Sequence, residues 1–273
     1  MKKIMLLLCA AAMLAVACEE EDPIHGDDNT TTSSDTTQMI AEIIPDVVVD
    51  IDGNHYSGIW IGNKLWMAEN LRTTHYADSS LVGWSAPANN ESYIPTYGLL
   101  YSWGTATHGH SSNNNPSGVQ GICPDGWHLP SDAEWTDLEN FVKIHNEYIC
   151  GDCDYCIAKS LAASSGWTSS AETCTPGYNQ NTNNATGFSA LPAGYGKRHQ
   201  AGGGGEPPYF YYSYEEFGSY AFFWSSTESV NDNTTYACSR ELVYNRTGLS
   251  YGCSAEQSSS KKVDAYSVRC VRD

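Results

Sequence analysis

The sequence predicts an α+β fold in which two helices accompany antiparallel strands, long loops and several disulfides. The order of the elements is the first observation, because strand-like segments come first, two helical segments follow, and strand-like segments fill the remainder. Composition is the second: 24 glycines and a charged fraction of 17% favour many turns over long solvated helices. The third is an even set of cysteines after the N-terminal region, which favours disulfides in an exported protein.

Two hairpins are predicted at the start of the domain. Apolar and polar side chains alternate in residues 47–56 on both sides of Asp52-Gly53. Residues 57–66 alternate in the same way around Gly62-Asn63. A period of two that is interrupted by such a dipeptide is typical of a β-hairpin.

Two helices are predicted in the middle of the chain. Ser131 and Glu134 have the spacing of a capping box, which marks a helix N-terminus. Apolar residues follow this box at helical spacing, namely Trp135, Leu138, Phe141 and Val142. We expect a second helix that Asp154 caps, that runs through Ala163 and that ends before Gly166.

The last third of the chain is strand-like. The predicted strands cover residues 187–195, 221–228, 236–244, 249–253 and 265–272. The longest irregular stretch, residues 197–219, combines a run of glycines with six aromatic residues. We expect this stretch to be a long loop, which is where binding residues are most often found.

One cysteine pair follows from local geometry. Residues 235–244 and 249–254 are strand-like and flank a turn sequence at Asn245-Arg246. Cys238 and Cys253 lie nearly equidistant from that turn, so a tight hairpin places them opposite each other. Cross-strand neighbours are close enough for a disulfide, and we expect Cys238–Cys253.

Four further cysteines cluster in the middle of the chain, at Cys150, Cys153, Cys156 and Cys174. Their spacing could hold zinc or an iron–sulfur cluster through thiolates. Export to an oxidising compartment favours two disulfides instead, in a pairing that the sequence leaves open. We therefore predict no metal at this cluster.

The N-terminus has the pattern of an export signal. Lys2 and Lys3 precede an apolar stretch that is too short to span a bilayer, and small residues lead to Cys18. Residues 14–18 resemble the lipobox of bacterial lipoproteins, in which the cysteine becomes the lipid-bearing N-terminus. We expect a signal peptide at residues 1–17, lipid attachment at Cys18, and an acidic, Thr- and Ser-rich disordered tether at residues 18–39. A domain at residues 40–273 follows.

The net charge of the chain limits the classes of molecule that it is expected to bind. Removal of residues 1–17 takes away two lysines and no acidic residue, which moves the formal charge from −18 to −20. Such a field repels nucleic acid and anionic lipid headgroups, so the lipid on Cys18 is the expected membrane contact. The acidic run at residues 19–22 resembles a surface-export signal of Bacteroidota lipoproteins, which implies an outer-membrane lipoprotein that faces the cell exterior.

Six ordered motifs resemble those of a known family, the Fibrobacter succinogenes major paralogous domain family. They are Trp66-Met-Ala-Glu-Asn-Leu-Arg72, Gly98-Leu-Leu-Tyr-Ser-Trp103, Cys123-Pro-Asp-Gly-Trp-His-Leu-Pro-Ser131, Gly187-Phe-Ser-Ala-Leu-Pro-Ala-Gly-Tyr195, Phe223-Trp-Ser-Ser-Thr-Glu228 and Ser267-Val-Arg-Cys-Val-Arg272. The resemblance implies a fold like that of C-type lectins and formylglycine-generating enzymes, and no established activity. In such a fold the first helix and the last strand lie side by side, which implies a Cys123–Cys270 disulfide.

The candidate ligand-binding residues lie in and after the aromatic stretch. Exposed tyrosine rings offer sugar C–H faces a flat apolar partner together with a hydroxyl. Calcium-dependent lectins hold Ca²⁺ through Glu-Pro-Asn and Trp-Asn-Asp, and this chain has only the broken echoes Glu206-Pro-Pro and Val230-Asn-Asp232. Calcium is thus possible but disfavoured. The candidates are Glu206, Tyr209, Tyr211, Tyr212, Tyr214 and Asp232.

Three functions remain open, in order of preference. The first is a non-catalytic surface lipoprotein that binds a glycan or a protein ligand. The second is a structural or assembly component of the cell surface, in which the aromatic stretch packs on itself. The third is an enzyme on the scaffold of the formylglycine-generating enzymes, which is disfavoured because the cysteines suit disulfides and no catalytic motif is present.

Overall fold

Antiparallel ladders dominate the computed structural model, which describes residues 42–202, 207–253 and 260–273. These residues belong to one compact unit, Met39–Asp273. The predicted signal peptide, the lipid site at Cys18, the tether and Glu206 lie outside the described residues. Among the residues described, no helix is long and apolar enough to cross a membrane.

The first sheet joins the two ends of the domain. Its strand order is β1-β2-β3-β12-β5, so the last strand of the chain lies between an early hairpin and a strand that precedes the long helix. The bounds are β1 (Ile44–Val49), β2 (His55–Ile61), β3 (Lys64–Met67), β5 (Trp127–His128) and β12 (Val271–Arg272). Both hairpins predicted at the start of the domain are confirmed, because β1 pairs with β2 and β2 with β3.

Two further sheets complete the β-structure of the described residues. One has the order β10-β9-β8 and the other β4-β11-β6-β7. The bounds are β4 (Tyr101–Ser102), β6 (Tyr195–Ala201), β7 (Tyr209–Glu215), β8 (Tyr220–Glu228), β9 (Ala237–Val243), β10 (Ser250–Gly252) and β11 (Ala265–Tyr266). The α+β class is therefore confirmed, with antiparallel pairing between all these strands.

The longest helix begins at the predicted capping box. In α3 (Asp132–Ile144) the Ser131 side chain accepts from the Glu134 N–H, and the Glu134 carboxylate accepts from the Ser131 N–H. The other helical turns are short: α1 (Ile94–Tyr97), α2 (Trp103–Thr107), α4 (Ala158–Leu161), and 3₁₀ turns at Pro87–Asn89, Glu91–Tyr93, Asn146–Tyr148 and Gln180–Thr182.

The second predicted helix is wrong in its length. A helix from Asp154 to Ala163 was expected from the sequence, but α4 begins only at Ala158. Cys153 and Cys156 form a disulfide, and the Cys156 N–H donates to the Cys153 carbonyl at 2.9 Å. This turn occupies the residues that would have formed the first helical turn.

Two predictions for the region before β8 are also wrong. Most of residues 187–195 follows an irregular path, and β6 begins only at Tyr195. The aromatic stretch, expected as a loop, contains all of β7 and all but the first two residues of β6. The two strands pair over seven residues from Tyr195↔Glu215 to Ala201↔Tyr209. Aromatic residues favour strands, but neither segment alone shows that it pairs with the other.

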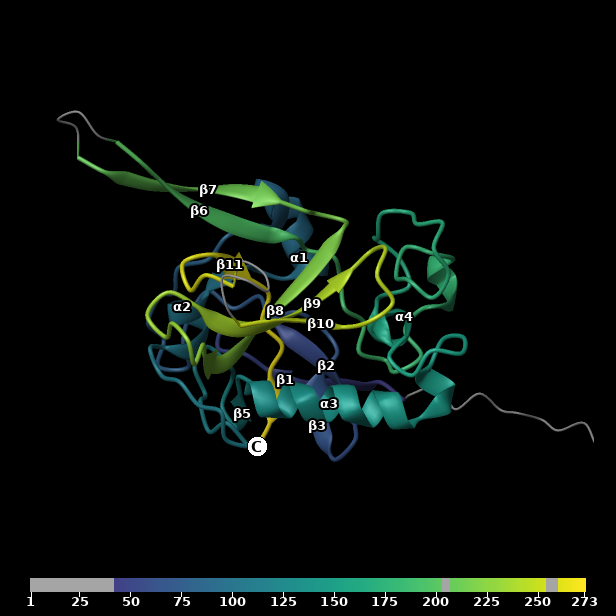
Figure 1. The fold of residues 1–273 in the computed structure, drawn as a ribbon. Coiled ribbons are helices and arrows are strands. Elements are labelled where there is room, and N and C mark those ends of the chain that lie inside the picture. Colours follow the sequence, from purple (N-terminus) through teal and green to yellow (C-terminus); the bar gives the residue numbers. More distant parts are fainter. Residues whose placement is uncertain (1–41, 203–206, 254–259) are drawn as a thin grey trace, which may run out of the picture. The chain divides into compact units, whose positions relative to one another are not determined.

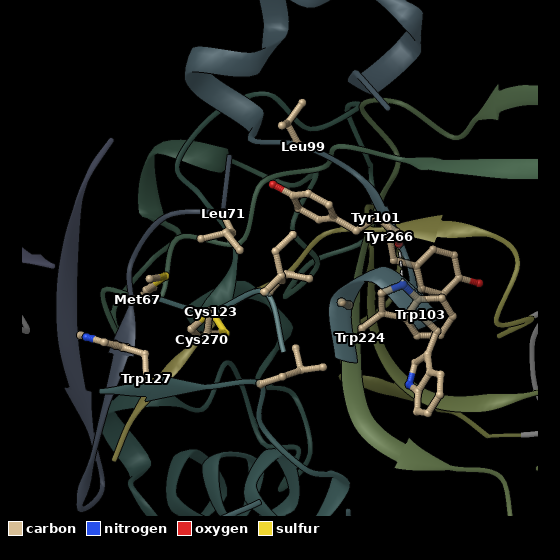
Figure 2. Packing of buried hydrophobic residues seen from close by; sticks show 14 of the residues in the cluster. Met67, Leu71, Leu99, Tyr101, Trp103, Cys123, Trp127, Trp224, Tyr266 and Cys270 are labelled. Carbon is tan, nitrogen blue, oxygen red and sulfur yellow. Dashed lines mark hydrogen bonds between the residues drawn. A yellow bond between two sulfur atoms is a disulfide. The ribbon is translucent and has the colours of Figure 1, made fainter. Parts of the chain in front are cut away.

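Two large clusters of buried side chains hold the sheets and α3 together. Trp224 is fully buried in the first cluster, where its ring stacks on Tyr266 at 4.1 Å and its indole N–H donates to the Tyr101 carbonyl (Figure 2). Trp66 and Trp135 belong to the second cluster, with ring centroids 4.8 Å apart. The tryptophans of the shared motifs are thus core residues, as Figure 2 shows for Trp103, Trp127 and Trp224.

All eight cysteines among the described residues lie in disulfides. Cys123 and Cys270, the pair that the family resemblance implies, are joined across 147 residues inside the first cluster (Figure 2). Cys238 and Cys253 are joined across the β9–β10 hairpin, in which Gly252 pairs with Ser239. The pairing that the sequence left open is Cys150–Cys174 and Cys153–Cys156.

Candidate functional site

Three consecutive exposed aromatic residues lie on the β6–β7 hairpin, called here the ribbon. Figure 1 shows the ribbon extending outward from the other strands of residues 42–273. Tyr209, Phe210 and Tyr211 are 62%, 54% and 48% exposed. Large apolar surface of this kind, held in regular structure, is typical of an interaction site.

One side of the ribbon carries a row of rings that we call the stacked face, formed by Tyr209, Tyr211 and His199. Residues 199 and 211 are cross-strand neighbours, and their rings stack at 5.1 Å with an interplanar angle of 18°. The ring of Tyr209 lies 6.3 Å from that of Tyr211. Because alternate residues of a strand share a face, the register sets these three rings side by side.

Polar groups continue the stacked face toward the body of the domain. The His199 Nε2 lies 2.8 Å from the Ser213 hydroxyl, which donates to the Glu215 carboxylate at 3.0 Å. The Tyr195 hydroxyl donates to the same carboxylate at 2.7 Å. The hydrogen bond from Tyr195 lowers the pKa of Glu215, so this end of the face is anionic at neutral pH.

The other side of the ribbon faces the body. Tyr212 and Tyr214 pack against a small cluster with Leu100 and Ala265, and the Tyr212 hydroxyl donates to the Val263 carbonyl at 3.0 Å. Gly196 permits this packing, because a side chain at that position would meet the rings of Tyr212 and Tyr214. The four tyrosines predicted to bind ligand are therefore divided between the two faces, and only Tyr209 and Tyr211 share the exposed one.

Asp232 lies in a turn that its own side chain stabilises. Its Oδ1 accepts from the Thr234 N–H, the Thr234 hydroxyl and the Thr235 N–H. These hydrogen bonds lower the pKa of Asp232. In the described part of the chain no group of three or more His, Cys, Asp or Glu side chains is arranged to hold a metal ion.

A buried polar network lies at the start of α3. Glu134 Oε1 lies 2.9 Å from His128 Nε2 and 3.0 Å from Lys64 Nζ, and His128 Nδ1 lies 2.6 Å from Asp273. Glu134 Oε2 accepts from the backbone N–H groups of Ser117 and Ser131. Each group has partners and Glu134 has no exposed surface, so we assign this network to the scaffold.

Among the hollows of the described residues that lie apart from the predicted site residues, two are bordered by histidines. One, of about 270 Å³, is bordered by His75 and Asp125, and the His75 Nδ1 lies 2.5 Å from Asp52. The other, of about 480 Å³, is bordered by His108 and His110, and His108 stacks on Tyr76 at 4.0 Å. The first hollow brings together residues 49–51, 73–77 and 122–125, which meet only in the fold, whereas the second is lined by the single segment 108–121.

A comparison with protein-family models gives one match over residues 59–272, to the model described as the Fibrobacter succinogenes major domain. The match covers more than half of the chain. No curated protein and no solved structure matches the chain.

Proposed function

Because the chain belongs to the Fibrobacter succinogenes major domain family, we propose that it is a non-catalytic surface lipoprotein with a C-type-lectin-like domain that binds a glycan on the stacked face. The observation that carries this proposal is the exposure of Tyr209 and Tyr211 beside His199 on a paired strand. A folded protein gains little stability from rings held in water, which favours a binding role.

The chemistry of the stacked face suits a sugar. Its rings present flat apolar surface to the C–H groups of a pyranose, while the Tyr209 and Tyr211 hydroxyls can donate or accept at the ring edges. Ser213 and Glu215 add acceptors for sugar hydroxyls at one end. The hydrogen-bonded ladder holds these groups in place, which reduces the entropy lost on binding.

The rest of the proposal concerns placement in the cell. A lipid on Cys18 would anchor the chain to the outer membrane, and residues 18–39 would separate the domain from the bilayer. The acidic run after Cys18 supports an outward-facing position. An acidic surface would keep the domain away from anionic headgroups, so the ribbon stays accessible.

A glycan array tests the proposal on the full chain, in detergent, with calcium and again with EDTA. We expect binding in both buffers, and we expect the double variant Tyr209→Ala with Tyr211→Ala to lose it. Two exposed tyrosines outside the ribbon, at 155 and 178, provide the matched control pair when changed to alanine.

Each other result points to a different function. Binding that disappears in EDTA would reject the stacked face in favour of a calcium site near Glu206 or Asp232. Absence of binding in both buffers would reject the glycan proposal and favour the structural or assembly role. Turnover of an array ligand would favour the enzyme.

A further inference from the structure

The outer edge of β7 is a separate feature of the ribbon from its two faces. The strand order β4-β11-β6-β7 makes β7 the edge of its sheet, with β6 as its one ladder partner in the described residues. A strand at a sheet edge carries backbone N–H and C=O groups that point away from the sheet. Another extended segment can pair with those groups.

The ladder indicates which residues present these groups. The Arg198 N–H points away from β7, since it donates to Asp264 Oδ1 at 3.0 Å. In an antiparallel ladder the N–H and C=O of one residue point the same way and alternate along the strand. Arg198 is opposite Tyr212, so the backbone groups of Tyr212, and of Phe210 two residues earlier, point outward from β7. Within the described residues these outward groups have no hydrogen-bond partner.

The usual protections of an exposed edge are absent from this strand. Lysine, proline and bulges discourage edge pairing in native sheets. Residues 209–215 contain no lysine and no proline, and their seven pairs with β6 run without a register shift. The outer half of the strand, Tyr209–Tyr211, is also its most exposed part. The edge is thus long, regular and open.

We propose that the edge of β7 at Phe210 and Tyr212 accepts an extended, lysine- or arginine-bearing segment of another protein as an added strand. The net charge of the chain indicates the charge of the segment that would pair with this edge. A chain of net charge −18 attracts a cationic segment. The two cations of the ribbon already have partners, because Lys197 lies 3.7 Å from Glu215 and the Arg198 guanidinium lies over the Phe210 ring. Glu216 adds a carboxylate at the end of β7. A second copy of the chain carries the same charge, so like-charge repulsion opposes pairing of two β7 edges.

The added strand occupies a surface that the glycan does not need. Its backbone pairs in the plane of the sheet, whereas the stacked face presents its rings above that plane. The two sites therefore share β7 but respond to different substitutions. Changes to the ring side chains address the glycan, and changes to the outward N–H groups address the peptide.

A labelled nine-residue peptide that alternates valine with lysine tests the inference by fluorescence anisotropy on the full chain. We expect it to bind at least tenfold more tightly than the same peptide with glutamate in place of lysine, at low salt. The peptide can be N-methylated at its odd-numbered residues or at its even-numbered residues, which gives two N-methylated phases. Only one phase removes the N–H groups that pair with β7, and we expect that phase to abolish binding.

Two variants of the protein isolate the backbone group. Phe210→Pro removes the ring and the outward N–H, while Phe210→Ala removes the ring alone. We expect Phe210→Pro to weaken peptide binding at least tenfold relative to Phe210→Ala, and both to retain glycan binding. Three results would overturn the inference. The two variants could bind the peptide equally well, both N-methylated phases could bind as well as the parent peptide, or the lysine peptide could fail to bind. Self-association that Phe210→Pro removes would also overturn it, in favour of a second copy.

Discussion

Polar and aromatic side chains have opposite surroundings at the start of α3 and on the ribbon. At the start of α3, Glu134 and His128 are buried and each charged group contacts a partner. On the ribbon, Tyr209 and Tyr211 are about half exposed, and their rings lie beside each other and beside His199. Both sets have regular geometry, but only the first is enclosed by the domain.

This difference separates residues that stabilise the fold from residues that are free to contact a ligand. Removing a group from the buried network leaves charges without partners in a medium of low polarity, which is costly. Removing a ring from the stacked face changes mostly surface that already contacts water. If this division is correct, substitutions in the two regions must differ in what they affect, and the following tests are ordered by the expected loss of stability.

The largest effect is expected from the disulfide that links the two ends of the domain. Replacing Cys123 and Cys270 with alanine opens a loop of 147 residues, and the chain-entropy model gives a loss of about 5 kcal/mol. Replacing Cys153 and Cys156, which are three residues apart, should cost about 2 kcal/mol. Denaturant unfolding measures both, and equal losses would contradict the assignment of the long link to the core.

The buried carboxylate at the start of α3 ranks second. Glu134→Ala leaves His128 and Lys64 without their shared partner, and the expected loss is about 3 to 5 kcal/mol. Asp137→Ala on the same helix is the matched control, because Asp137 is exposed and accepts a hydrogen bond from the Asn115 side chain, so its loss should cost less than about 1 kcal/mol. A loss for Glu134→Ala as small as that of the control would remove the network from the scaffold.

The same network predicts the pH dependence of stability. Burial raises the pKa of Glu134, but hydrogen bonds from His128 and the Ser131 N–H outweigh burial and lower this pKa to about 2. Its contribution is present above pH 4.5 and disappears as the pH falls from about 4.5 to about 2. Burial lowers the pKa of His128, but the hydrogen bond with Glu134 outweighs it and raises this pKa.

The contribution of His128 is therefore complete below about pH 6.5 and disappears as the pH rises through its raised pKa. Thermal unfolding across this range should give a maximum Tm between these two limits. Glu134→Gln should flatten the decline on the acidic side. A wild-type Tm that does not change between pH 5 and pH 2 would refute this explanation.

The smallest loss of stability is expected on the ribbon. Tyr209→Ala with Tyr211→Ala removes exposed rings and one cross-strand stack, so the free energy of unfolding should fall by less than about 1 kcal/mol. Circular dichroism and denaturant unfolding measure this effect. A loss comparable to that of Glu134→Ala would mean that the rings belong to the core.

Local patterns predicted the elements that local chemistry determines. The hairpins at Asp52-Gly53 and Gly62-Asn63 and the capping box at Ser131 are confirmed, because turn dipeptides and caps act within a few residues. The β9–β10 hairpin is confirmed for the same reason. The structure also contains the Cys238–Cys253 disulfide that its register suggests.

The ribbon was not predicted because its two strands, although consecutive, lack the local signals of a hairpin. Residues 195–201 include Gly-Lys-Arg-His-Gln, which lacks the alternation of a strand, and only the partner β7 makes β6 regular. The same pairing sets His199 beside Tyr211, so the histidine was missed as part of the site. Tyr212 and Tyr214 were grouped with Tyr209 because sequence proximity does not reveal which face contacts the body.

Binding by the stacked face is the central claim, and calorimetric titration with the strongest array ligand tests it most directly. The account predicts that the Tyr209→Ala, Tyr211→Ala variant binds at least tenfold more weakly than the wild type. The control variant Tyr155→Ala, Tyr178→Ala should bind the ligand with the affinity of the wild type. Retention of full affinity by the ribbon variant, with its fold intact, would contradict the account.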